Sequence, residues 1–176
     1  MTRNIVNKTI TQERAAGAIM GAFIGDALAL GPHWYYDLAE LRRDYGEWIT
    51  TYTDPKPGRY HSGRKAGQLS QAGIILTLTL QSLVEHGGYN EADFCRRMDQ
   101  ELFPFLDGTP MNGPGGYTSQ SIREAWQRRV EQKLPWGQTG SLMRMIPKQL
   151  NAHWLWPFVT HFSLLNLLPQ SRVILA

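Results

Sequence analysis

Apolar and small residues recur at helical spacing along the first 133 residues, between loops rich in glycine and proline. This pattern predicts five helices, over residues 11–30, 37–46, 70–86, 90–106 and 119–132. Asp37 and Asn90 have the side-chain chemistry that favours a helix start, and Gly87 with Gly88 favours a helix end. No strand pairs and no internal repeats are evident, so the sequence predicts an all-α fold.

The predicted helices differ in how their apolar residues are distributed. Helix 11–30 carries a stripe of small residues that lets another helix approach closely: Ala15, Gly17, Ala18, Gly21, Ala22 and Gly25. Helix 70–86 is apolar on almost all sides, which predicts a central, buried helix. Helices 90–106 and 119–132 each have one apolar face, formed by Phe94, Met98, Leu102 and Phe105 in the first and by Ile122, Ala125, Trp126 and Val130 in the second.

Composition narrows the class of protein. A hydrophobic fraction of 42% with 11% aromatic residues excludes intrinsic disorder. The chain has one cysteine, Cys95, which excludes a disulfide framework and favours a reducing, cytoplasmic compartment. Because Cys95 lies in the middle of a predicted helix, we expect its thiol to be buried in the core. The most apolar run, residues 154–168, is 15 residues long and contains Pro157, so it falls short of the roughly 20 residues of a membrane span.

Charge is distributed unevenly along the chain. The net charge is +3, but all 15 acidic residues lie within residues 1–131. The last 45 residues hold four basic residues and no acid, so the positive excess belongs to them alone. The remainder is nearly neutral, which argues against nucleic acid as a partner. We therefore expect two regions, residues 1–133 and an atypical tail, residues 134–176.

Four places in the first region could carry chemistry. Asp26 ends a tightly packed apolar helix, where an acid either faces a cleft or caps a neighbouring loop. His33 and Trp34 follow it, and could bind a ligand or fill core. A basic loop around His61, with Arg59, Tyr60, Arg64 and Lys65, could hold an anion or be merely solvated. The glycines of residues 113–116 precede a helix, as in an anion site or a structural turn.

Two of these motifs resemble a known family. Residues 17–28, which end Gly25-Asp26-Ala27-Leu28, followed by Gly67-Gln68-Leu69-Ser70, are similar to the ADP-ribosylglycohydrolase (DraG-like) family over about residues 12–133. The family pattern is a small-residue helix ending Gly-Asp-Ala-Leu-Gly and a second motif Gly-x-x-Thr-Asp-Asp-Thr. The resemblance implies an all-α fold and hydrolysis of the ADP-ribose glycosidic bond with two Mg²⁺ ions.

The chain departs from the family at the metal positions. Ser70 matches the family threonine, but Gln71 and Ala72 stand where two aspartates are expected. A second family motif, Asp-x-Asp-Thr, cannot exist, because no acid follows Glu131. Mg²⁺ binding is therefore not expected here, and the sequence predicts no metal ligands. Proximity to the motifs suggests a pocket for ADP-ribose or a related nucleotide, lined by Asp26, His33, Trp34, Ser70, Gly115, Gly116 and Tyr117.

The acid-free tail has two interpretations. The coding DNA can also be read in a frame that starts two bases later, so that each new codon spans two of the present ones. In that frame the Met145-Ile146 junction can encode only Asp, the His153-Trp154 junction only Leu, and the Trp156-Pro157 junction only Ala. This favours a shifted reading frame near residue 142 and a fold incomplete at its C-terminus. Alternatively, residues 140–147 resemble a Gly-x-x-Met-Arg-x-x-Pro loop of the family and belong to the original frame.

The sequence thus predicts an incomplete, inactive ADP-ribosylglycohydrolase-like protein with poor solubility. The alternative is a non-catalytic module that binds ADP-ribose or a nucleotide, or has a structural role as in a lens-crystallin offshoot of the family. We expect no membrane span.

Overall fold

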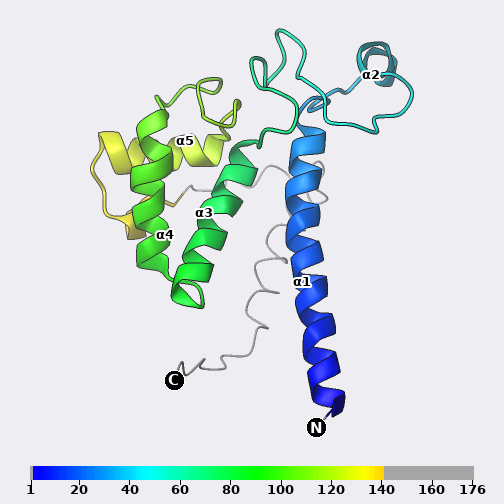
Figure 1. Ribbon diagram of the computed structural model, residues 1–176. Helices are drawn as coiled ribbons and strands as arrows, with labels where there is room; N and C mark the ends of the chain where they lie inside the picture. The colour runs from blue at the N-terminus through cyan, green and yellow to red at the C-terminus, as the bar shows by residue number, and fades with distance from the viewer. Residues whose placement is uncertain (1, 141–176) are drawn as a thin grey trace, which may run out of the picture. The chain divides into compact units, whose positions relative to one another are not determined.

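Helices are the only regular secondary structure in the computed structural model, which describes residues 2–140. The chain divides into two compact units, Met1–Ser141 and Leu142–Ala176, and the second lies outside the described residues. The α-helices are α1 (Thr2–Ala29), α2 (Leu38–Tyr45), α3 (Gln71–His86), α4 (Glu91–Arg97) and α5 (Gln120–Trp126) (Figure 1). The predicted all-α class is confirmed.

Side-chain caps explain where three of the helices begin. The Asp37 carboxylate accepts a hydrogen bond from the backbone N–H of Ala39 at 2.8 Å, and α2 starts one residue after Asp37. Ser70 and Asn90 cap α3 and α4 in the same way. Gly87, in the left-handed conformation with φ of 66°, ends α3. The predicted boundaries of α2 and α3 therefore agree with the structure.

Helices 90–106 and 119–132 are not continuous, contrary to the prediction. α4 passes into a π-helical turn (Met98–Leu102) and a 3₁₀ turn (Phe103–Phe105), and α5 passes into a second π turn (Gln127–Glu131). A π turn inserts a residue into the helix and so rotates every face that follows it. For this reason Phe105 and Val130, predicted to face inward, are 65% and 44% exposed.

The core lies between α3, α4 and α5, and the α3–α4 pair stands side by side in Figure 1. Its buried residues are Leu78, Met98, Leu102, Phe103, Leu106 and Trp126. The indole N–H of Trp126 donates to the Phe103 carbonyl oxygen at 3.1 Å, so the one polar atom of that side chain is satisfied inside the core. Trp136–Gln138 forms a last 3₁₀ turn, and its Trp136 stacks on Phe103.

The helices α1 and α3 are less buried than their sequences predict. Gly17, Gly21 and Gly25 of the small-residue stripe have no neighbour within 4 Å of an added Cβ. In α3 one face is buried, through Leu78, Thr79 and Ser82 among others, whereas Val84 is 84% exposed. Within residues 2–140, therefore, no helix fills the stripe and α3 is not surrounded.

Some predictions fall on the undescribed part of the chain. The apolar run 154–168 and the frameshift hypothesis lie outside the described residues, as does all of the predicted tail after residue 140. Among the helices that the structure describes, none combines the length and apolarity needed to cross a membrane.

Candidate functional site

The two sequence motifs meet where α1 ends and α3 begins. The Asp26 carboxylate accepts hydrogen bonds from the Ser70 backbone N–H at 2.8 Å and from its hydroxyl at 2.5 Å. The Ser70 oxygen in turn accepts from the N–H of Ala72 at 3.1 Å. A Cβ on Gly73 would lie 2.3 Å from Asp26 Oδ2, so only glycine fits there. Asp26 therefore fixes the start of α3, which is the capping role that the sequence left open.

Gln71 is the second residue that ties the site together. Its side chain is 8% exposed, and its Oε1 accepts a hydrogen bond from the Ser119 backbone N–H at 2.6 Å, at the start of α5. Gly115 packs directly on it, since a Cβ on Gly115 would lie 2.0 Å from the Gln71 nitrogen. Gln71 thus connects α3, α5 and the turn formed by residues 113–116, which we call the glycine turn. The sequence did not predict this role.

The donor set at the start of α3 does not fit Mg²⁺. Mg²⁺ requires hard oxygen ligands, above all carboxylates, at near-octahedral geometry. Here the Ser70 hydroxyl is hydrogen-bonded to Asp26, the Gln71 oxygen is held by Ser119, and Ala72 has no side-chain oxygen. The Asp26 carboxylate lies in this arrangement, but both of its oxygens accept hydrogen bonds from Ser70, so it does not supply the set of free carboxylates that the metal would need.

Much of the backbone of the glycine turn is engaged in hydrogen bonds, within the turn or with neighbouring side chains. The Gly113 N–H donates to the Gly116 carbonyl at 3.1 Å, and the Gly116 N–H donates back at 2.9 Å. Arg64 donates to the Pro114 carbonyl, and His61 Nδ1 lies 3.0 Å from the Gly115 carbonyl oxygen. These contacts are those of a structural turn, which the sequence allowed as one interpretation. An anion at this turn stays a prediction.

Three aromatic rings pack together beside the glycine turn. The ring centroids of Trp34 and Tyr60 are 4.1 Å apart, and Tyr117 lies 5.0 Å from Trp34 and 5.1 Å from Tyr60. Trp34 and Tyr60 are 38% and 37% exposed. Trp34 also has φ of 58°, a left-handed conformation that bulky residues rarely adopt and that tends to occur at functional sites. The sequence placed Tyr60 only in the basic loop.

Two histidines lie next to these rings. His33 and His61 are 4.7 Å apart between ring centroids and nearly perpendicular, at 85°. Burial lowers the pKa of His33 to about 4; His61 adds to this effect and Asp26 opposes it. Burial likewise lowers the pKa of His61. Both shifts favour the neutral form of the imidazole.

The structure brings all seven predicted site residues into one neighbourhood. Asp26 holds Ser70, and Gly115 lies against Gln71 beside Ser70. A Cβ on Gly116 would lie 2.8 Å from His61 Nδ1. His61 packs on His33, His33 lies 5.1 Å from Trp34, and Trp34 contacts Tyr117. Their contact with a ligand stays a prediction.

A group of possible metal ligands lies elsewhere, between α3 and α4. Ligand atoms of Glu85, His86 and Asp93 come within 4.8 Å of one another. However, Asp93 is paired with Arg96 and Arg97, and Arg97 also pairs with Glu85. The hydrogen bond from Arg97 is the main cause that lowers the pKa of Asp93. The carboxylates of Glu85 and Asp93 are therefore already paired with the guanidinium groups of Arg96 and Arg97, as in an ion-pair network with a structural role.

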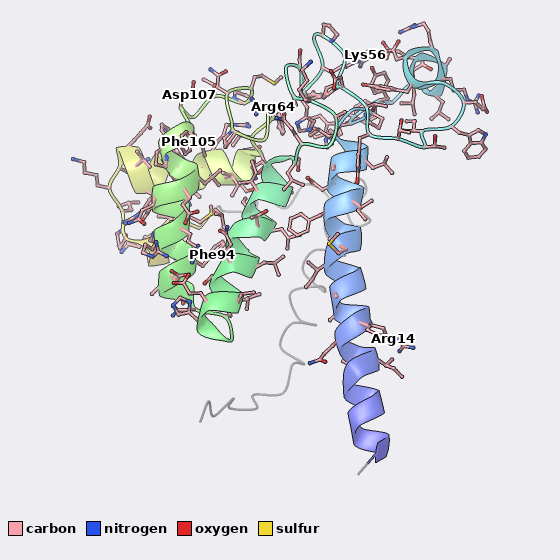
Figure 2. All side chains as sticks on the ribbon, in the orientation of Figure 1. Arg14, Lys56, Arg64, Phe94, Phe105 and Asp107 are labelled. Atoms are coloured by element: carbon pink, nitrogen blue, oxygen red, sulfur yellow. The ribbon has the colours of Figure 1, made fainter. Side chains whose placement is uncertain are left out.

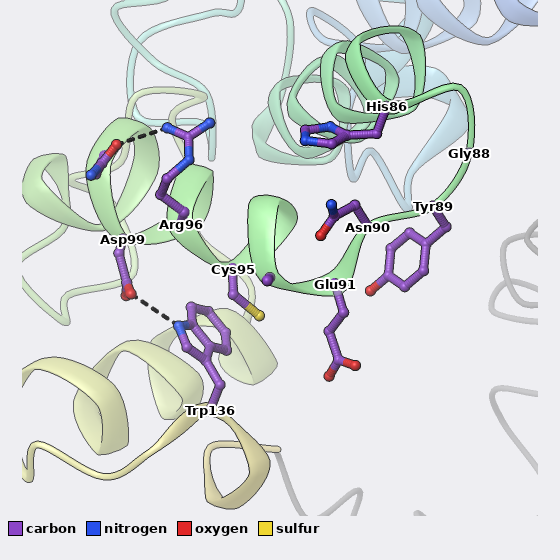
Figure 3. A pocket seen from close by; sticks show the side chains of 11 residues that line it. His86, Gly88, Tyr89, Asn90, Glu91, Cys95, Arg96, Asp99 and Trp136 are labelled. Carbon is purple, nitrogen blue, oxygen red and sulfur yellow. Dashed lines mark hydrogen bonds between the residues drawn. The ribbon is translucent and has the colours of Figure 1, made fainter.

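A shallow groove of about 960 Å³ runs along α4 (Figure 3). Its lining includes Cys95, Asp99 and Trp136, and the Trp136 indole N–H donates to Asp99 at 3.0 Å. Cys95 is half-buried here rather than in the core, contrary to the prediction, and burial raises the pKa of its thiol. None of the residues that line this groove belongs to the two motifs.

Comparison with known proteins agrees with the two motifs. A sequence model of the ADP-ribosylglycohydrolase family matches residues 7–157, which includes Asp26, Ser70 and the glycine turn. The match extends beyond residue 133, where the sequence resemblance was expected to end. No curated protein and no solved structure matches the chain. Because the family model covers most of the sequence, the chain belongs to the ADP-ribosylglycohydrolase family.

Proposed function

We propose that this family member binds ADP-ribose or a related nucleotide without hydrolysing it. The observation that carries the proposal is the engagement of the family metal positions in structural contacts. Ser70 is bonded to Asp26, and Gln71 caps α5. The family reaction, hydrolysis of the ADP-ribose glycosidic bond, depends on metal-bound carboxylates that this site does not supply.

Binding would rely on side chains next to the motifs. The partly exposed Trp34 and Tyr60 offer ring faces on which a nucleobase can stack. Arg59 and Lys65 of the neighbouring loop supply positive charge, although each is paired with a carboxylate, Glu40 and Asp54 respectively. A diphosphate would compete for these cations.

The experiment is a calorimetric titration of the full chain with ADP-ribose, in Mg²⁺ and in EDTA. We expect the same Kd in both, and no release of ADP-ribose from a modified protein. Trp34→Ala should weaken binding about tenfold or more, the effect of losing one base stacked on an aromatic side chain. Trp48→Ala, which removes an indole that is 82% exposed outside the cluster, is the matched control. Mg²⁺-dependent release of ADP-ribose would contradict the proposal.

A purely structural role is the competing proposal, and one observation favours it. Asp26 and Ser70 satisfy each other, and Gly113 and Gly116 do the same through their backbones. A site whose polar groups are paired internally needs no ligand to be stable. The absence of heat in both titrations would support this alternative.

Two further expectations remain proposals. The single cysteine suits a reducing compartment, and we propose a cytoplasmic location, which fractionation of cells tests directly. A frameshift near residue 142 would make residues 143–176 unrelated to the family, whereas the family match to residue 157 favours the alternative that the original frame continues past residue 147. Sequencing the coding DNA tests this, and an in-frame read with ordinary codon usage to Ala176 would rule it out.

A further inference from the structure

His61 has an unpartnered ring nitrogen in a buried position. The residue is 3% exposed, and its Nε2 has no hydrogen-bond partner among the described residues. Its other nitrogen, Nδ1, lies 3.0 Å from the Gly115 carbonyl oxygen and can donate to it only when Nδ1 carries the proton. The Tyr117 N–H competes for the same nitrogen as an acceptor, at the longer distance of 3.4 Å, so the shorter contact favours a protonated Nδ1. In that tautomer Nε2 carries a free lone pair.

This is the arrangement in which proteins hold a metal-binding imidazole. Ligating histidines nearly always donate their second N–H to a carbonyl or carboxylate, which fixes both the tautomer and the ring orientation. Here the glycine turn performs that task, and the turn itself is held by Gln71 and by Arg64. The His61 ring is thus fixed before any ligand arrives.

A second imidazole lies next to the first. His33 is half-buried, its ring centroid is 4.7 Å from that of His61, and its ring forms no hydrogen bond within residues 2–140. Rotation of this ring about its side-chain bonds could bring one of its nitrogens toward His61 Nε2. The Asp26 carboxylate acts electrostatically on both rings and offsets part of a cation's charge, whereas Arg64 opposes it.

We propose that His33 and His61 form a binding site for a divalent transition-metal ion such as Zn²⁺. Imidazole nitrogens favour Zn²⁺, Ni²⁺ or Cu²⁺ over Mg²⁺, so the site is chemically distinct from the carboxylate site of the family. Two protein ligands leave coordination positions open for water or an added ligand. The proposal does not rest on nucleotide binding.

A metal at the Glu85–His86–Asp93 group, or a water at His61, is less well supported by the contacts. The Glu85–His86–Asp93 group offers one imidazole, but its carboxylates are already paired with Arg96 and Arg97. A buried water could satisfy His61 Nε2, yet it needs two to four polar partners, and a metal titration distinguishes it from an ion.

The test is a calorimetric titration of the EDTA-treated full chain with Zn²⁺, with Co²⁺ absorption as a direct record of nitrogen ligation. We expect one equivalent of Zn²⁺ to bind with a Kd in the micromolar range. His33→Gln and His61→Gln should each weaken it by about tenfold or more, since each removes a ligand. His86→Gln, and a double His153→Gln/His161→Gln variant, remove the remaining histidines and should leave the Kd unchanged.

The variants must also report on folding. Unfolding curves without metal show whether His61→Gln has lost the glycine turn, and His33→Gln, which leaves the bond to the glycine turn intact, keeps the test valid if it has. The proposal is overturned if Zn²⁺ fails to bind, if His33→Gln binds as tightly as the original chain, or if binding follows His86 instead.

Discussion

The Ser70 hydroxyl forms hydrogen bonds in both directions, donating to Asp26 and accepting from the first N–H groups of α3. One atom therefore serves as a helix cap and as the link between α1 and α3. The residue type is sufficient for both tasks, because a hydroxyl is donor and acceptor at once. Ser70 therefore caps α3 and links it to α1 in this chain, even though the neighbouring residues Gln71 and Ala72 offer no carboxylate.

Replacing Ser70 by alanine should lower the free energy of unfolding by about 1–2 kcal/mol, because the cap and one bond to Asp26 are both lost. Ser119→Ala is the matched control, since Ser119 precedes α5 without a capping hydrogen bond from its side chain. The control should change the free energy by less than about 0.5 kcal/mol. Urea unfolding measures both, and equal losses would contradict the role assigned to the Ser70 hydroxyl.

At the scale of elements, two π turns meet through one ion pair. Asp99 lies in the turn after α4 and Arg129 in the turn after α5, and the Arg129 guanidinium donates to both Asp99 oxygens, at 2.9 Å for the shortest bond. Trp136 adds its indole N–H to the same carboxylate. The pair fixes how the second half of each helix lies against the other.

These turns also mark the limit of what the sequence could predict. Helix existence, the caps at Asp37 and Asn90, and the end at Gly87 follow from local chemistry, and the structure confirms them; the cap at Ser70 is seen only in the structure. The π turns are joined by an ion pair between residues 30 positions apart, which periodicity does not contain. The same holds for the site: the motifs indicated Asp26 and Ser70, but Gln71 gains its role only through Ser119.

The packing of the glycine turn on α3 gives a prediction at this scale. Gly115→Ala would place a Cβ 2.0 Å from the Gln71 nitrogen, and backbone on both sides cannot yield cheaply. We expect a loss of about 1–3 kcal/mol in the free energy of unfolding, as for other overpacked sites. Gly137→Ala, with nothing within 4 Å of the added Cβ, is the control and should be nearly neutral. Equal stability of the two variants would show that the turn does not pack on α3 in solution.

In the first unit, few of the described residues pack against α1. From residue 10 onward, buried residues appear only near its C-terminal end, at Ala27 and at Leu30 just after it, where Asp26 reaches Ser70. Figure 2 shows Arg14 on the part of α1 that lies away from α3. Upstream of Ala27, Met20 and Ile24 are 58% and 46% exposed. Being four residues apart, they lie on one face of the helix, so their exposed apolar surface is contiguous.

This surface should dominate the solution behaviour of the chain. A double Met20→Gln/Ile24→Gln variant removes apolar surface without removing a contact of the described core, so we expect lower fluorescence of the dye ANS, a larger soluble fraction and an unchanged unfolding midpoint. Val84→Gln is the control, because Val84 is 84% exposed and belongs to α3 rather than α1. If the double variant instead unfolds at lower denaturant than the original chain, the α1 face is packed against something in solution, and its exposure is not a property of the folded protein.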